Sequence, residues 1–400
     1  MALCIYCKET HASASCPLYL KAQALFKAKS WKLSSEMSTQ APAPFIGHFG
    51  YPHVSVGVLS PPEKVDNTWE YDAPRHWAVG NYQIPNIVEF RSALVNSRTS
   101  TPIKEVTSKI VQTIQEVAMA SRPVDIDIKL SATPHFSVQS DGYSAPVGPS
   151  GSLKEVKLTT NPTIPSRVER AVSDTDLLAQ DAITSLYSKG MDEHALTKLL
   201  SVGALGLGAK RKLVPTKWSI TATDDMLGKK VRDEIRDFPM ADYRLYIGGY
   251  LGNYYLILLF PQSFSYELFE SSVRNEGPLS WSTDHETTFG RKEYASETAG
   301  GYYACRLAIL EKLKAMRKQA TVLALRFITN EYTLPLGVWV VREATRKALA
   351  SDPVILASKG DLLKHAINEV KERFGVNPSS LLGQSKVLQG LSQRSLWSFS

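Results

Sequence analysis

Segments with the apolar spacing of helices and segments with the apolar pattern of strands both occur along the chain, and this mixture limits the folds that it can adopt. A spacing near 3.6 predicts amphipathic helices over residues 102–119, 174–189, 193–202, 297–316, 343–349 and 359–374. Alternation or short apolar runs predict strands over residues 54–58, 125–130, 242–247, 253–260 and 321–328. Because 43% of the 400 residues are hydrophobic, the chain can bury a proper core. We therefore expect a mixed α/β (α+β) fold with a single large globular core.

Local composition divides the chain into three parts. Residues 1–33 form a Cys- and Lys-rich element, residues 34–375 form the core, and residues 376–400 form a flexible tail rich in Ser, Gly and Gln. The Pro/Gly-rich residues 140–165 predict an irregular connection at which the core could divide into two subdomains. The longest apolar run, residues 254–260, is far shorter than the ~20 residues of a membrane-spanning helix. We expect a cytoplasmic protein without membrane contact.

Positive charge is concentrated in the middle of the chain, in the stretch KRKLVPTKWSITATDD at residues 210–225. The cations are Lys210, Arg211, Lys212 and Lys217. Residues 218–223 alternate apolar with polar side chains and predict a half-buried strand that follows a loop carrying the cations. Since clustered cations are typical of a nucleic-acid interface, these four side chains are candidates for phosphate contacts. A solvated loop before a core strand is the alternative.

Three cysteines and one histidine lie close together near the N-terminus, with the spacing C-x2-C-x3-H-x4-C. They are Cys4, Cys7, His11 and Cys16. Thiolates and imidazole are preferred zinc ligands, and a segment this short and polar needs the metal to supply its folding energy. Four protein ligands leave no open position for catalytic water, so we predict a structural zinc site. Three unrelated reduced thiols beside a surface histidine are the alternative.

Side chains that could perform acid–base or phosphate chemistry occur at the end of the central stretch and between residues 284 and 306. The candidate catalytic residues are Asp224, Asp225, Asp284, His285, Glu286, Arg291 and Arg306. The acids and the histidine could ligate a metal or transfer protons, and the arginines could bind phosphate. For residues 284–286 a solvated loop is the alternative. No P-loop or helicase motif identifies a reaction.

Aromatic side chains are frequent in residues 66–85, which contain Trp69, Tyr71, Trp77 and Tyr82 beside cations. Aromatic rings next to positive charge can stack on bases. The alternative is that they pack a loop onto the core.

The last residues, QRSLWSFS, resemble the motif that binds the sliding clamp PCNA. One turn of 3₁₀ helix would bring Leu396 and Phe399 together as an apolar plug, with Gln393 making polar contacts beside them. Trp397 would add buried area, whereas Ser400 stands where a second aromatic residue is usual. Residues 393–400 are therefore predicted to bind PCNA.

Several short blocks resemble, in order, the archaeal Nre family of DNA repair proteins. The blocks are residues 210–225 together with FGYP at 49–52, PVGPSG at 146–151, SDTD at 173–176, GRKEY at 290–294 and GVWVVRE at 337–343. The resemblance covers nearly the whole chain. It implies a role in repair of DNA damage, an N-terminal zinc-binding element and a C-terminal tail that binds PCNA. His11 stands where the family pattern has a cysteine.

We therefore expect a DNA repair factor that PCNA recruits to DNA, with other repair proteins as further candidate partners. One alternative is a repair enzyme, such as a nuclease or an enzyme that processes nucleotides or ADP-ribose, which would use the acidic and arginine residues named above. Another is a non-catalytic adaptor between PCNA and a second repair protein. The sequence does not decide between a catalytic and a non-catalytic core.

Overall fold

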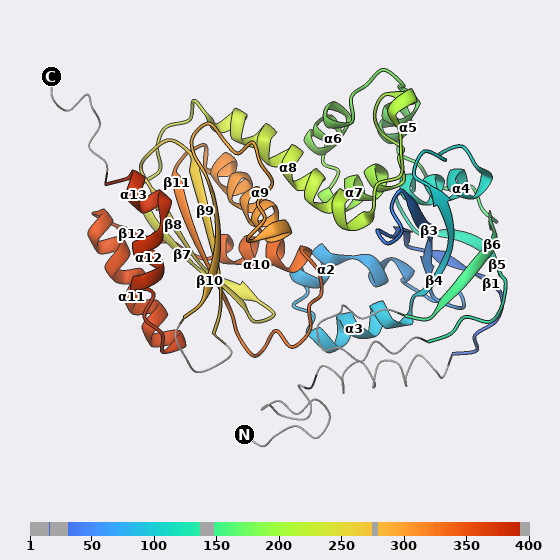
Figure 1. The fold of residues 1–400 in the computed structure, drawn as a ribbon, viewed down its shortest axis with the longest axis horizontal. Coiled ribbons are helices and arrows are strands. Elements are labelled where there is room, and N and C mark those ends of the chain that lie inside the picture. Colours follow the sequence, from blue (N-terminus) through green and yellow to red (C-terminus); the bar gives the residue numbers. More distant parts are fainter. Residues whose placement is uncertain (1–15, 17–30, 137–147, 274–278, 393–400) are drawn as a thin grey trace. The chain divides into compact units, whose positions relative to one another are not determined.

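Two six-stranded sheets organise the chain in the computed structural model, which describes residue 16 and residues 31–136, 148–273 and 279–392 (Figure 1). Each sheet belongs to a separate unit. Unit 1 comprises residues 1–227 and 333–336, and unit 2 comprises residues 228–332 and 337–400. The boundary falls inside one long helix, α8 (Thr216–Ile235). The expected mixed α/β fold class is confirmed, and the chain divides into two compact units.

Unit 1 is built on a mixed sheet in the order β1-β5-β6-β4-β3-β2, in which only β4 and β6 run parallel among the strands described. Its strands are β1 (Glu36–Ala41), β2 (Ala43–Ile46), β3 (His53–Ser60), β4 (Val95–Pro102), β5 (Val124–Leu130) and β6 (Ser150–Leu158). Its helices before α8 are η2 (Thr68–Asp72), α2 (Pro74–Val79), α3 (Ile84–Ala93), α4 (Lys109–Met119), α5 (Ser166–Ser173), α6 (Ala179–Ser188), α7 (Glu193–Ser201) and η3 (Gly208–Lys210).

The core of unit 1 lies between the sheet and the helices α4 and α7. Val54, Val56 and Val58 of β3 are fully buried, so the predicted alternation of this strand is confirmed. The predicted helix over residues 102–119 begins only at Lys109, because residues up to Pro102 still pair with β3 as part of β4. The hydroxyl of Ser108 then caps α4 by accepting from the Val111 amide.

Two further predictions for unit 1 are wrong in part. The helix predicted over residues 174–189 is α6, but it begins only at Ala179. The Asp174 carboxylate accepts from the amides of Asp176 and Leu177 and so turns the chain between α5 and α6. The irregular connection expected over residues 140–165 contains β6, which pairs with both β4 and β5. A subdomain boundary therefore does not fall at residues 150–158.

Unit 2 contains a sheet in the order β10-β9-β11-β8-β7-β12, in which β9 and β11 run parallel. Its strands are β7 (Tyr243–Tyr250), β8 (Asn253–Phe260), β9 (Ser265–Ser272), β10 (Trp281–Glu286), β11 (Thr321–Ile328) and β12 (Val354–Leu356). Its helices after α8 are α9 (Ala299–Met316), α10 (Trp339–Ala350), α11 (Lys359–Phe374), α12 (Ser379–Gln384) and α13 (Lys386–Gly390). The predicted hairpin of β7 and β8 is confirmed, with Leu251 and Gly252 both at positive φ in its turn.

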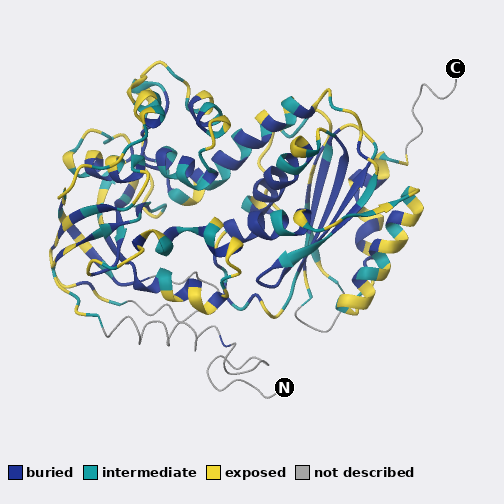
Figure 2. Ribbon diagram, turned by 180° about the vertical axis from the view of Figure 1, so that it is seen from behind, coloured by how far each residue is buried: buried dark blue, intermediate teal, exposed yellow. Residues whose placement is uncertain are grey.

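Helices cover both faces of the unit 2 sheet: α9 and α10 lie on one face, and α11, α12 and α13 lie on the other (Figure 1). The central strands are consequently buried along most of their length (Figure 2). Strands whose two faces are both covered by helices have continuous runs of apolar residues in their sequence. This is why the sequence predicted β8 and β11.

The expectation of a flexible tether before the PCNA motif is wrong for residues 379–390, which form α12 and α13. Apolar side chains of these helices, Leu381, Leu382, Val387 and Leu388, are buried against the sheet. Glu267 of β9 accepts hydrogen bonds from the Ser385 hydroxyl and from the backbone amides of Lys386 and Val387. A fully buried carboxylate on a distant strand thus holds the start of α13, and residues this far apart in sequence leave no local pattern.

Candidate functional site

The central stretch forms the start of helix α8 and not the predicted strand. Pro215 directly precedes the helix, and its carbonyl accepts from the amides of Trp218 and Ser219. Ser219, Thr223 and Leu227 are four residues apart and fully buried, as the inward face of a helix requires. Two of these three side chains are polar, whereas Trp218 is exposed. The apolar–polar alternation therefore predicted the wrong residues to be buried: Trp218 was expected to face the core, but Ser219 does.

The four cations of this stretch divide into two groups. Lys210, Lys212 and Lys217 are exposed. Arg211 instead holds the surrounding loops together, since its Nε donates to the Gly206 carbonyl at 2.8 Å and its Nη2 donates to the Asp174 carbonyl at 2.9 Å. The exposed lysines are available to an anionic ligand, and Arg211 is engaged within unit 1.

The candidate catalytic residues lie in both units. Asp224, which is buried, and Asp225, which is half-buried, belong to the unit 1 part of α8. Residues 284–286, Arg291 and Arg306 belong to unit 2. Within unit 2, acids and arginines that are distant in sequence are brought together between the sheet and α9.

Residues 284–286 form the end of β10 and not a solvated loop. Asp284 and Glu286 are buried on the side of the strand that faces α9, and His285 between them is exposed. The Asp284 Oδ2 atom accepts from the backbone amide of Thr298 at 2.7 Å and from its hydroxyl at 3.0 Å. Since Thr298 immediately precedes α9, this carboxylate fixes the start of the helix.

Arg291 braces the loop that carries the block GRKEY. Its guanidinium donates to the carbonyls of His285, Glu293 and Tyr294, and its Nη2 lies 2.8 Å from Asp284 Oδ1. Gly290 lies beside it at φ +81°, a backbone conformation that favours glycine. The loop is therefore constrained by contacts of Arg291 that are internal to unit 2.

Arg306 of α9 and Glu286 of β10 form a buried ion pair, with 2.8 Å between Nε and Oε1. Their side chains are 2% and 0% exposed, so the pair is shielded from solvent. Burial raises the pKa of the neighbouring Tyr302 hydroxyl well above its usual range, and the charge of Glu286 adds to the effect. Both effects favour the neutral form of this hydroxyl.

A second buried arginine, Arg326 of β11, was missed from the sequence because it lies within an apolar run. It pairs with Glu270 of β9 and donates through Nε and Nη2 to the side-chain oxygen of Asn253. Gly301 of α9 is needed nearby, since a Cβ there would lie 2.6 Å from Glu270 Oε1. The arginine on an otherwise apolar strand was the signal that could have revealed this pair.

The space between the unit 2 sheet and α9 therefore holds three arginine–carboxylate pairs: Asp284 with Arg291, Glu286 with Arg306, and Glu270 with Arg326. In each pair the carboxylate is already matched by a cation. In the part of the chain that the structure describes, no group of three His, Cys, Asp or Glu side chains could hold a metal ion. The arrangement can neutralise charge and position α9, and a catalytic role for its members stays a prediction.

Unit 1 contains another charge cluster that the sequence did not reveal, centred on Asp72. The buried carboxylate contacts Arg91 of α3 at 2.8 Å and both His194 and Lys198 of α7 at 2.7 Å. Burial opposes ionisation of Asp72, but the charges of His194, Lys198 and Arg91 outweigh it and hold the pKa well below its usual range. Asp72 thus ties η2 to two helices.

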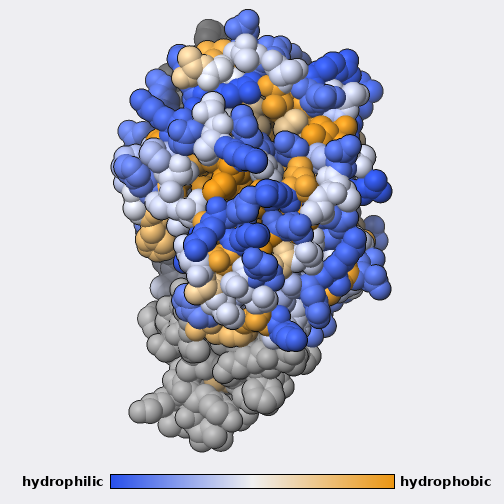
Figure 3. Space-filling view, turned by 90° about the vertical axis from the view of Figure 1, so that its right-hand side faces the viewer, coloured by the Kyte–Doolittle hydropathy of each residue, from blue (hydrophilic) through white to orange (hydrophobic). Residues whose placement is uncertain are grey.

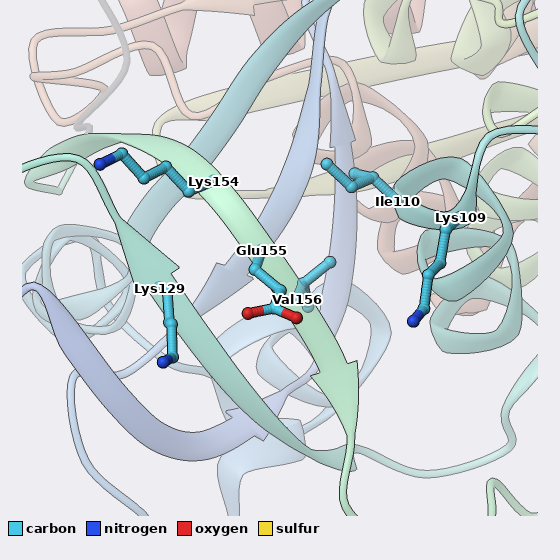
Figure 4. A pocket seen from close by; sticks show the side chains of 6 residues that line it. All are labelled: Lys109, Ile110, Lys129, Lys154, Glu155 and Val156. Atoms are coloured by element: carbon cyan, nitrogen blue, oxygen red, sulfur yellow. The ribbon is translucent and has the colours of Figure 1, made fainter.

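A shallow pocket of about 380 Å³ lies between α4 and the strands β5 and β6 of unit 1 (Figure 4). Lys109, Lys129 and Lys154 line it around Glu155. Hydrogen bonding and charge from Lys157, 2.6 Å away, lower the pKa of Glu155. On this side of unit 1 hydrophilic side chains predominate, with apolar ones in small patches between them (Figure 3). The lysines here are thus accompanied by acids, such as Glu155.

The predicted zinc and PCNA contacts fall largely outside the described residues. Of the proposed ligands only Cys16 is described, and it is buried; Cys4, Cys7 and His11 are not. Gln393, Leu396, Trp397 and Phe399 also lie outside the described part. Among the helices that are described, none is long and apolar enough to cross a membrane.

Comparison with known proteins matches residues 11–276 to the family model "Archaeal Nre, N-terminal" and residues 286–399 to "Archaeal Nre, C-terminal". A DNA repair protein NreA of Haloferax volcanii is 34% identical over 88% of this chain and 86% of its own length. DNA repair proteins NreB and NreA of Archaeoglobus fulgidus are 34% and 32% identical, each over at least 90% of both chains. No solved structure matches. The chain therefore belongs to the archaeal Nre family, as the sequence blocks suggested.

Proposed function

We propose that this chain acts in DNA repair and that the sliding clamp PCNA recruits it through residues 393–400. Its membership of the Nre family supports the role in repair, because the matched relatives are named DNA repair proteins. The motif Gln393, Leu396 and Phe399 supports the choice of PCNA. Recruitment by a clamp would raise the local concentration of the protein at DNA without requiring strong DNA affinity.

The observation that carries this proposal is the position of the motif relative to α13. Helix α13 ends at Gly390, and the motif begins at Gln393. Because Val387 and Leu388 are anchored in the core of unit 2, only a few residues separate the folded protein from the first motif residue. A short connection of this kind would hold unit 2 close to the clamp, whereas a long tether would not.

Calorimetric titration of PCNA tests the proposal. Deletion of residues 393–400, or the double change Leu396→Ala and Phe399→Ala, is expected to abolish binding, because two buried apolar side chains contribute roughly 1.5–3 kcal/mol each. Ser400→Phe is expected to tighten binding by supplying the second aromatic ring. The matched control is Gln384→Ala, on the exposed side of α12. Binding by the truncated chain that equals the wild type would contradict clamp recruitment.

We also propose a structural zinc ion held by Cys4, Cys7, His11 and Cys16. The donor set fits zinc, since three thiolates and an imidazole complete a tetrahedral site. Cys16, the one donor described, is fully buried, as a ligand in a closed site should be. Bound zinc would supply folding energy to the N-terminal element.

Elemental analysis of purified protein tests the zinc site, with about one zinc per chain as the expected result. The double change Cys7→Ser and Cys16→Ser should remove the metal, whereas Cys305→Ala should retain it because Cys305 lies in the core of unit 2. Zinc retention by the double variant would reject this ligand set.

The exposed Lys210, Lys212 and Lys217 are proposed to contact DNA phosphates. Replacing all three with Ala should weaken DNA binding at every sequence and flatten its dependence on salt by about two units of slope. Arg211 is omitted from this variant because it holds the loops of unit 1 together. An unchanged salt slope would exclude these lysines from the interface.

A further inference from the structure

Three aromatic rings are exposed where two segments of unit 1 meet. Phe49 and Tyr51, in the turn between β2 and β3, are 82% and 47% exposed, and Trp218, in the first turn of α8, is 44% exposed. The Tyr51 and Trp218 rings lie 5.2 Å apart at their centroids. Single exposed apolar residues are ordinary on a protein surface, but large aromatic rings gathered at one place commonly mark a contact surface.

Hydrogen bonds fix the turn to the neighbourhood of α8. The Ile46 amide donates to the hydroxyl of Thr216, the first residue of α8, at 3.1 Å. On the other side, the Ile103 amide donates to the Pro52 carbonyl, and the Leu213 amide donates to the Ile103 carbonyl. Both ends of the turn are therefore tied to the segment that carries the exposed lysines, and the rings are held in place by backbone contacts.

Within the turn, the backbone itself presents the rings. Gly50, at φ +84°, accepts from the His53 amide through its carbonyl, which places Tyr51 and Pro52 at the tip. The ring of His48 packs on Phe49, with 4.0 Å between centroids. A Cβ on Gly50 would lie 2.8 Å from the His53 carbonyl oxygen, so the turn needs glycine here.

The second of the two segments, residues 194–223, carries a net positive charge. Neither residues 42–62 nor residues 194–223 contain an aspartate or glutamate. Lys212 and Lys217, both exposed, lie within the second segment, and the exposed Lys104 directly follows Ile103. The nearest acid in sequence to Lys104 is Glu105, which accepts from the amide and hydroxyl of Thr107. The surface thus combines aromatic rings with cations that have few acids among them.

We propose that Phe49, Tyr51 and Trp218, with Lys212 and Lys217, form a stacking platform for single-stranded DNA. Unpaired bases stack on aromatic rings irrespective of sequence, while lysines attract the phosphates between them. The absence of acids from both segments favours a polyanion over an apolar protein segment. The choice of DNA as the polymer rests on the proposed role in repair.

Three of the four aromatic residues that the sequence indicated for stacking pack against Phe90 instead. Trp77 is fully buried and stacks on Phe90, and Tyr71 and Tyr82 also pack against Phe90. Trp69 is 42% exposed and packs edge-on against His76. It has nearly the exposure of Trp218 but lies outside the platform, so it is a matched control.

Fluorescence anisotropy with a labelled oligothymidylate of about 12 nucleotides tests the proposal on the full-length chain. Trp218→Ala and Phe49→Ala should each weaken binding about tenfold, which corresponds to 1.4 kcal/mol, without changing the salt slope. Trp218→Phe should recover most of the affinity, because a flat ring is retained. Lys217→Ala should flatten the salt slope by about 0.7. Trp69→Ala and Lys154→Ala should bind as the wild type does.

Three outcomes would overturn the platform: no measurable binding by the wild-type chain, equal losses in Trp69→Ala and Trp218→Ala, or tighter binding to a duplex of the same length than to the single strand. Thermal unfolding of each variant separates loss of binding from loss of folding. Because PCNA binding is measured without DNA, and residues 393–400 can be deleted without touching the platform, failure of clamp recruitment and failure of this proposal are distinguishable.

Discussion

Glu267 offers the sharpest test of how the C-terminal helices are held. Its fully buried carboxylate accepts from the Ser385 hydroxyl at 2.5 Å and from the amides of Lys386 and Val387 at 3.0 and 3.1 Å. The change Glu267→Gln keeps the size of the side chain and replaces a charged acceptor with a neutral amide. We expect α12 and α13 to open more often from the sheet.

The structure sets the size of this effect. In Glu267→Gln a single oxygen still accepts, because the amide nitrogen is a donor. Each bond that remains loses about 1 kcal/mol with the charge, and a donor left without an acceptor costs about 1–3 kcal/mol, which together amount to about 3 kcal/mol or more. Burial of Leu381, Leu382, Val387 and Leu388 contributes roughly 1.5 kcal/mol or more for each side chain. Because the apolar contribution is the larger, the helices should stay docked and open about 100-fold more often.

Hydrogen–deuterium exchange with mass spectrometry measures this opening directly. Amides of residues 381–391 should exchange about 100-fold faster in Glu267→Gln, while those of β8 stay protected. Glu297→Gln, a change of the same kind at an exposed position, is the control. Unchanged protection of residues 381–391 would show that apolar burial alone anchors the helices, and the reasoning about Glu267 would be wrong.

Three further changes test the buried interactions by denaturant unfolding. Asp72→Asn should cost about 3–5 kcal/mol at pH 7, since it leaves buried cations uncompensated. Because the pKa of Asp72 is lowered in the folded state, its charge stabilises the fold at pH values above the unfolded pKa of about 3.9. The free-energy cost of Asp72→Asn should therefore shrink as pH falls through the folded pKa, and a cost independent of pH would contradict this. Arg306→Met should cost about 3–5 kcal/mol, and adding Glu286→Gln should recover much of it; additive losses would argue against a coupled pair. Gly57→Ala should destabilise unit 1 by about 3 kcal/mol because its Cβ would lie 1.9 Å from the Ser97 carbonyl oxygen, and a wild-type midpoint would refute that.

Helices and strands with consistent apolar spacing were predictable, because local sequence and burial agree in them. The predicted helices over residues 193–202, 297–316 and 359–374 correspond to α7, α9 and α11, and the strand predicted at 321–328 is β11. In α9 and α11 the predicted inward side chains, such as Leu307 and Leu362, are fully buried.

The candidate site was less predictable because polar side chains are buried there and aromatic ones are exposed. In α8, Ser219 and Thr223 face inward and Trp218 faces solvent, so a pattern that assumes apolar burial selects the wrong face. In β10, the period of two is carried by Asp284 and Glu286, whose burial depends on arginines elsewhere in the chain.

The sequence by itself determined the family, the mixed α/β class, and the motifs at the two ends, because these depend on residue identity and on spacing over a few turns. The tertiary structure decided which charges are neutralised and which remain on the surface. The hydrogen bond between Ser385 and Glu267 and the ring contact between Tyr51 and Trp218 form only when the chain folds. Such pairs lie more than a hundred residues apart, and burial of a polar group is favourable only when its partner is in place. A local sequence pattern therefore cannot predict these contacts.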